Sequence, residues 1–205
     1  MNLDRIRIKP KTGQEKLIYN GKELDFSVVD FWRWSTSDIL SNTIRGGFAE
    51  FIVATALNLD MTVLRDEWSA FDFITPEGIK VEIKCSAYIQ SWFQRTLSTI
   101  SFSTKHAFYW DSDTNKFSDI KKRHANVYVF CLLHHTDKAT IDPLNINQWE
   151  FYVLSTQTLN DYKRSQYSIT LKSLRGLTSK VPYEKLKETI IYKHKENKQE
   201  NHTCT

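Results

Sequence analysis

Short apolar runs separated by polar turns follow one another along the chain and predict a mixed α/β fold. Residues 46–59, "GGFAEFIVATALNL", are apolar around most of a helix, which predicts a buried helix. "AFDFIT" and "IKVEIKCS" then read as two strands joined by a turn at Pro76 and Gly78. Further runs of β-branched and aromatic residues, each of strand length, lie at 99–104, 126–133 and 149–155.

The remaining segments predict helices and connections around these strands. A helix start with a serine or threonine cap is expected near Ser35, Thr36 or Ser37, and residues 1–30 give no firm element. A polar, basic-ended loop is expected at 111–124, a short helix at 156–164, and a helix at 182–190 with Pro182 in its first turn. The expected divisions are an extension packing on the core (1–34), one α/β domain (35–192) and a disordered polar tail (193–205).

Composition narrows the class without fixing a function. The 205 residues are 40% hydrophobic and 25% charged, which suits a globular chain able to bury a core. No apolar stretch approaches the roughly 18 residues of a membrane span, and the first residues lack a signal peptide's apolar core. Three cysteines make no even disulfide framework, so we expect a reducing cytoplasm. The formal charge of +4 is compatible with a polyanionic partner.

One acidic residue interrupts the apolar helix at 46–59. Glu50 is the only charged residue there, and its neighbours three and four positions away are glycine, valine and alanine. Burying an unpaired carboxylate is costly, so Glu50 requires a cation or a hydrogen-bond donor. The alternatives are a pair with Arg45 at the helix mouth, a solvated position, or membership of a site.

Two charged residues share one face of the second hairpin strand. In "IKVEIK", alternation places Ile79, Val81 and Ile83 on one face, and Glu82 beside Lys84 on the other. The spacing alone is weak, because Glu196 and Lys198 repeat it where no strand is expected.

Asp72 strengthens the pattern, since it lies ten residues before Glu82 across the turn. Carboxylate oxygens suit a hard cation such as Mg²⁺, with Mn²⁺ as a substitute. A lysine beside them can hold an attacking water and offset phosphate charge, which is what phosphodiester hydrolysis requires.

These residues resemble the PD-(D/E)XK nuclease superfamily, and within it most nearly Holliday-junction resolvases and type II restriction enzymes. The match is "RGGFAEFIVATAL…FDFITPEGIKVEIKCSAY", roughly residues 45–90, with Phe71 where the superfamily often has proline. The resemblance implies a restriction-endonuclease-like fold, a central mixed sheet flanked by helices. It also implies metal ligation by Asp72, Glu82 and the Ile83 carbonyl, with Glu50 supporting the metal directly or through water. Lys84 would assist the nucleophile, and Ser86 and Gln90 occupy positions of auxiliary polar residues.

The register of the hairpin decides whether this site can form. If only residues 75–78 form the turn, Asp72 pairs with Val81 and points away from Glu82. A convergent site requires a five-residue loop, a bulge, or Asp72 at a twisted strand end.

Other polar and aromatic groups have ordinary explanations. Cys131 and His134 lack the second ligand pair of a zinc site, and with His135 they are expected in the core or a loop. Trp92 and Phe93 are more often core residues than stacking platforms beside Arg95. Contact with a nucleic-acid backbone is considered for four basic residues, the alternative being a solvated loop: Lys105, Lys121, Lys122 and Arg123.

The sequence therefore predicts a Mg²⁺-dependent nuclease, expected to be an endodeoxyribonuclease that acts on DNA. Cutting both strands of a duplex would call for a homodimer. The alternatives are a nucleic-acid-binding module of the same fold that does not cut, or an interaction protein whose hairpin charges are solvated.

Overall fold

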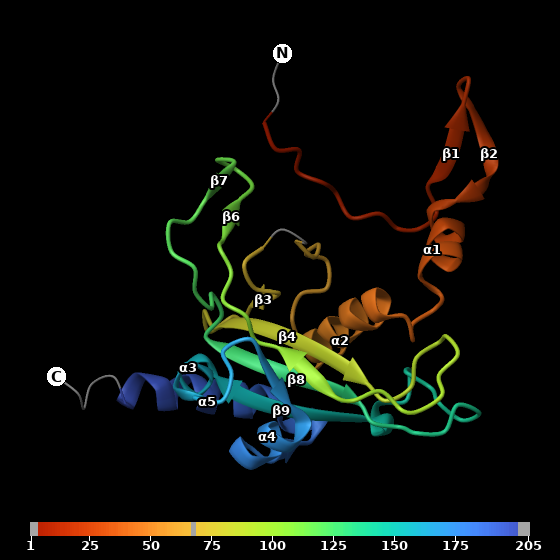
Figure 1. The fold of residues 1–205 in the computed structure, drawn as a ribbon. Helices are drawn as coiled ribbons and strands as arrows, with labels where there is room; N and C mark the ends of the chain where they lie inside the picture. Colours follow the sequence, from red (N-terminus) through yellow and green to blue (C-terminus); the bar gives the residue numbers. More distant parts are fainter. Residues whose placement is uncertain (1–3, 67–68, 201–205) are drawn as a thin grey trace.

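A five-stranded mixed sheet forms the centre of the computed structural model, which describes residues 4–66 and 69–200 (Figure 1). The strand order is β11-β9-β8-β4-β3, with β4 and β8 parallel and the other neighbours antiparallel. This confirms the predicted α/β class with a mixed sheet. The strands are β3 (Phe73–Ile74), β4 (Lys80–Ala87), β8 (Val127–Leu133), β9 (Trp149–Ser155) and β11 (Lys180–Val181).

The central strand is apolar because both of its faces are covered. All seven residues of β8, "VYVFCLL", are buried, as a continuous apolar run predicts for a strand inside a sheet. β4 lies one strand nearer the edge and keeps an alternating pattern, with Val81 and Ile83 buried and Glu82 and Lys84 partly exposed. The edge of the sheet is therefore where polar groups reach solvent.

Different elements cover the two faces of the central sheet. On one face, α2 (Asn42–Ala56) and α5 (Leu186–Glu200) pack against Val81 and Ile83 in one apolar cluster. On the other face, α3 (Thr156–Asp161), α4 (Leu171–Leu177) and a small sheet of β5 (Ser101–Ser103) with β10 (Ser168–Thr170) build a second cluster. The short 3-10 helices are Ile146–Gln148 and Tyr183–Lys185.

Two predictions about the connections are corrected by the structure. The strand expected at 99–104 forms as β5, but it pairs with β10 and not with the central sheet. The expected loop at 111–124 overlaps a small hairpin of β6 (Trp110–Asp111) and β7 (Lys116–Phe117). Apolar periodicity predicts that a strand forms but does not specify its partner. The partner of β5 is the distant strand β10, and the partner of β6 is the neighbouring strand β7.

The N-terminal residues form more structure than their sequence pattern indicates. β1 (Lys16–Tyr19) and β2 (Lys22–Ser27) make a ribbon, followed by α1 (Val28–Thr36). Figure 1 shows this ribbon extending away from the sheet, in contrast to the predicted extension packed on the core. The expected cap near residues 35–37 is instead the end of α1, and Ser41 precedes α2.

The C-terminal helix is longer than predicted. α5 continues to Glu200, so residues 193–200 are helical where a disordered tail was expected. Lysine, glutamate and glutamine are good helix formers, and Lys193 pairs with Glu196 one turn apart. The rest of the predicted tail, 201–205, lies outside the described residues. Among those described, no helix combines the length and apolarity needed to cross a bilayer.

Candidate active site

The register of the β3–β4 hairpin brings Asp72 beside the strand that carries Glu82. Phe73 pairs with Val81 and Ile74 with Lys80, and the amide of Thr75 donates to the carbonyl of Ile79 at 2.9 Å. Residues 75–79 thus form the five-residue loop that a convergent site requires, with Gly78 at φ +78°. The strand pairs end at Phe73 and Val81, so Asp72 lies just beyond the end of β3, close enough to Glu82 for the two charges to interact.

Asp72 caps the open edge of β4. Its Oδ2 accepts a hydrogen bond of 2.5 Å from the amide of Ile83, and its own amide donates to the carbonyl of Val81 at 3.0 Å. β3 begins only at Phe73, so the carboxylate takes the place of a further strand partner. The aspartate is therefore fixed against the strand that carries Glu82.

Glu82 and Lys84 form an ion pair on β4. Their side chains are 17% and 29% exposed, and they are beside Tyr128 and Phe130 of β8 in the parallel register. The pair thus lies next to buried aromatic rings, where the local dielectric is low and charges interact strongly. The predicted alternation of β4 is confirmed.

Glu50 faces the same region from α2, but its partner is Arg65. Arg65 donates to both carboxylate oxygens of Glu50, in one case over 2.9 Å, and the Glu50 side chain is only 14% exposed. Arg45, the partner considered from sequence, is buried and donates instead to Asn42, Gln90 and the Leu40 carbonyl. Nothing in the sequence signalled Arg65, which lies fifteen residues from Glu50.

Crowding of the three carboxylates shows in the acidity of Asp72. Burial, together with the negative charges of Glu82 and Glu50, raises the pKa of Asp72 to about 7. The hydrogen bond from Ile83 and the charge of Lys84 act in the opposite direction and are weaker. A bound cation would relieve this repulsion, so the donor set has the chemistry of a metal site.

The carboxylates do not, however, form a closed cage. Within residues 4–66 and 69–200, no group of three His, Cys, Asp or Glu side chains gathers closely enough to hold an ion. Asp72 and Glu82 supply two neighbouring carboxylates, and Glu50 is paired with Arg65. This fits a magnesium ion that keeps several waters and takes one or two protein carboxylates.

The two residues considered as auxiliary, Ser86 and Gln90, lie in different environments. Ser86 follows Lys84 on the same face of β4 and is half-buried. Gln90 is buried, and its amide binds Arg45, the Ala87 carbonyl and Ser98. Gln90 therefore holds the segment after β4 together, and an auxiliary role for it stays a prediction.

The four basic residues considered for nucleic-acid contact differ in their exposure to solvent. Lys105, Lys121 and Lys122 are exposed. Arg123 is buried and donates to Asn160 and to Gln166, among other partners, and burial lowers its pKa. Contact of Arg123 with a nucleic-acid backbone is therefore wrong, because its guanidinium points inward and is fully engaged.

Aromatic and sulfur-bearing candidates occupy different environments. Trp92 and Phe93 are on the surface, 51% and 84% exposed, so the preference for core positions was wrong. Cys131 is buried in the core beside Cys85, as expected, and burial raises the pKa of the Cys85 thiol to about 11. His134 and His135 bind an asparagine carbonyl and a threonine hydroxyl in loops.

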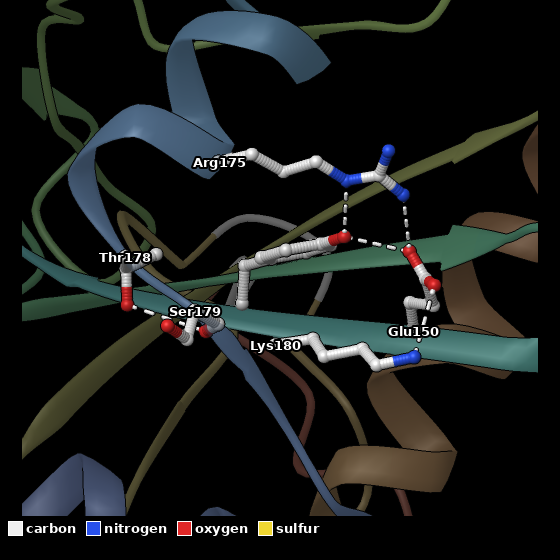
Figure 2. Close-up of a pocket in the computed structure, with 6 residues that line it drawn as sticks. Glu150, Arg175, Thr178, Ser179 and Lys180 are labelled. Carbon is white, nitrogen blue, oxygen red and sulfur yellow. Dashed lines mark hydrogen bonds and ion pairs between the residues drawn. The ribbon is translucent and has the colours of Figure 1, made fainter.

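A shallow pocket of about 290 Å³ lies away from the carboxylates, over β9, α4 and β11 (Figure 2). Arg175 donates to Glu150 and to the Tyr152 hydroxyl, each at 2.8 Å, and Tyr152 donates to Glu150 at 2.6 Å. Lys180 pairs with the same glutamate at 3.5 Å. Because Arg175 and Lys180 share the single carboxylate of Glu150, this network joins α4 and β11 to the sheet.

A comparison with protein-family models matches residues 29–173, more than half of the chain, to the family described as bacteriophage T4 endonuclease IV. The matched region contains Glu50, Asp72, Glu82 and Lys84. No curated protein matches the chain. The family match supports a nuclease function.

Proposed function

The chain belongs to the bacteriophage T4 endonuclease IV family, and from this membership we propose that it is a metal-dependent endonuclease that hydrolyses phosphodiester bonds of DNA. The observation that carries the site assignment is the hairpin that brings Asp72 close to Glu82, with Lys84 paired to Glu82. This arrangement also supports the resemblance to the PD-(D/E)XK superfamily.

Asp72 and Glu82 are the residues proposed to hold Mg²⁺, or Mn²⁺ in its place, with the Ile83 carbonyl as a further ligand. When bound, the ion would polarise a phosphate oxygen and lower the pKa of a water molecule. Asp72 is prepared for this role because the Ile83 amide fixes its carboxylate and because crowding makes its negative charge unfavourable without a cation.

Lys84 is proposed to act on the attacking water and on the charge of the phosphate. Its ammonium pairs with Glu82 in the protein alone. Neutralising Glu82 by a cation would free this ammonium to donate to water or to a phosphate oxygen. Ser86, next along the same face, is a proposed auxiliary contact.

Glu50 and Arg65 are proposed to support the site electrostatically. The Glu50 charge acts on Asp72, and the pair with Arg65 limits that effect. A binding module without catalysis is less well supported, since three acidic side chains in the absence of a cation would repel a nucleic-acid backbone.

The deciding experiment measures cleavage of supercoiled plasmid and of single-stranded DNA with Mg²⁺ or Mn²⁺, beside EDTA. The Glu82→Gln variant removes the charge and keeps the shape, and Glu188→Gln, an exposed helical glutamate paired with Lys185, is its matched control. The proposal expects metal-dependent cleavage by wild type and Glu188→Gln and none by Glu82→Gln. Equal cleavage by Glu82→Gln would reject this site.

A further inference from the structure

The N-terminal ribbon and α1, residues 16–36 and here called the arm, carry a concentrated apolar surface. Eight large side chains on it are exposed: Leu17, Ile18, Tyr19, Leu24, Phe26, Phe31, Trp32 and Trp34. None of the residues of α1 is buried, although the helix contains three aromatic rings. Large exposed apolar surfaces on soluble proteins often mark an interaction site.

The arm is locally ordered even though its surface is uncovered. Ser27 and Asp30 cap α1, with hydrogen bonds of 2.8 and 2.7 Å from the Ser27 amide and hydroxyl to the Asp30 carboxylate. The amide of Val29 donates to the Gly13 carbonyl, and Gly13 at φ +93° approaches the Trp32 ring so closely that a Cβ would lie 3.0 Å from it. The arm thus presents a defined shape.

A two-stranded ribbon is marginally stable alone in water, and both of its edges invite pairing. Nearly every residue of β1 and β2 is exposed, and Figure 1 shows the ribbon projecting from the sheet. Covering this ribbon would remove apolar side chains from water and complete backbone hydrogen bonds at its edges.

The charges of the arm favour a protein over a nucleic acid. Three basic residues, Lys16, Lys22 and Arg33, are balanced by three acidic ones, Glu23, Asp25 and Asp30, so residues 16–36 have no net charge. Binding a phosphate backbone requires a surplus of positive charge. A surface that is neutral, mixed in sign and apolar can instead match its own copy across a two-fold axis.

The exposed area is large enough for such contact. Taking about 200 Å² for each aromatic side chain, the five exposed aromatic residues offer on the order of 600 Å². Exposed leucine and isoleucine side chains of the ribbon add to this. A standard interface buries about 800 Å² on each partner.

We propose that the arm is a dimerisation surface that docks on the arm of a second copy of this chain. The ribbon precedes residue 29 and lies outside the part shared with the endonuclease family, whereas nearly all of α1 lies within it. The inference concerns assembly and does not depend on the proposed hydrolysis. The docked arms would leave one Asp72–Glu82 site on each protomer.

The test is the mass of the full chain in solution by sedimentation equilibrium, from about 1 to 200 μM. The expected result is a concentration-dependent shift toward twice the 24.1 kDa monomer mass. Trp34→Glu and Ile18→Glu should raise the dimer dissociation constant at least tenfold. Phe93→Glu is the matched control for Trp34→Glu, since both side chains are 84% exposed, and it should leave the constant unchanged.

A monomeric wild type over the whole range would overturn the proposal, and so would arm variants that dimerise like wild type. Circular dichroism checks that the variants fold, and if the charged ones do not, Trp34→Ser and Ile18→Ser repeat the comparison. Arm variants with unchanged mass but weakened, salt-dependent DNA binding would reassign the surface to nucleic acid. Equal dissociation by Phe93→Glu would also count against the arm.

Discussion

Asp72 lies close to Glu82 at the end of the β3–β4 hairpin, and the Asp72 carboxylate accepts the amide hydrogen of Ile83 at 2.5 Å. The contact fixes one acidic group beside another at the sheet edge. Burial and the neighbouring negative charges then raise the pKa of Asp72 to about 7. The same geometry that makes the metal-free protein less stable at neutral pH also prepares the proposed cation site.

Asp72→Asn should stabilise the metal-free protein at neutral and higher pH. The pKa of Asp72 is raised from 3.8 to about 7 on folding, so the native state binds more protons than the unfolded state between these values. Wild-type stability from this group is full below about pH 4 and is lost as the pH rises through 7. At about 1.4 kcal/mol per pKa unit, the variant should gain roughly 2–4 kcal/mol by pH 8.

Urea denaturation with EDTA at pH 4, 6 and 8 measures this difference. Asp119→Asn, a substitution of an exposed loop aspartate, serves as the control. If Asp72→Asn and wild type keep the same difference in unfolding free energy at all three pH values, the Asp72 carboxyl does not titrate as described.

Mg²⁺ should stabilise the wild type more at pH 8 than at pH 5. At the lower pH Asp72 is protonated and cannot ligate a cation, whereas at the higher pH its charge is present and unfavourable until a cation binds. Thermal unfolding with and without 10 mM MgCl₂ reports the shift. Glu82→Gln should abolish most of it, while Glu188→Gln should preserve it. A shift of the same size at both pH values would mean that Mg²⁺ binds elsewhere.

Lys84→Met should reduce cleavage about 10²- to 10⁴-fold, the usual contribution of a group that transfers or orients a proton. DNA affinity should change little in comparison, because one lysine contributes a small part of the electrostatic binding. Lys80→Met is the control, since Lys80 is an exposed lysine on the same strand and face. Single-turnover kinetics separate the two effects; comparable losses in both variants would argue for a general charge effect.

Arg65→Met should move the pH profile of cleavage toward alkaline values. Without Arg65, the Glu50 charge is less compensated and raises the pKa of Asp72 further, so a higher pH is needed to ionise it. The profile of single-turnover rate against pH reports the shift, with Arg164→Met at an exposed loop position as control. An unshifted profile would separate the Glu50–Arg65 pair from the site.

Arg123→Met should cost about 3–5 kcal/mol of stability, because buried partners lose a charged donor that they share. Lys121→Met and Lys122→Met should leave the unfolding free energy within about 0.5 kcal/mol, since both side chains are exposed. If these lysines touch DNA, each should lower the salt slope of binding by about one. Chemical denaturation and binding at several salt concentrations measure the two effects.

Local patterns alone determined much of this protein. The continuous apolar run of β8 predicts a buried strand, and the alternation of β4 predicts a strand with one polar face. The two-residue period of a strand places Glu82 and Lys84 on the same face. The apolar helix around Glu50 could also be predicted from the sequence, because helical periodicity depends on residues close together in the chain.

Tertiary structure decided what depends on distant partners. The register of the β3–β4 hairpin depended on one residue of loop length, and the hydrogen bond between the Thr75 amide and the Ile79 carbonyl belongs to the longer loop. The pairing of Glu50 with Arg65 and the inward turn of Arg123 follow from packing between separated segments. A sequence records which groups need partners; only the folded chain, by excluding water from some positions and leaving others open, selects which partners they find.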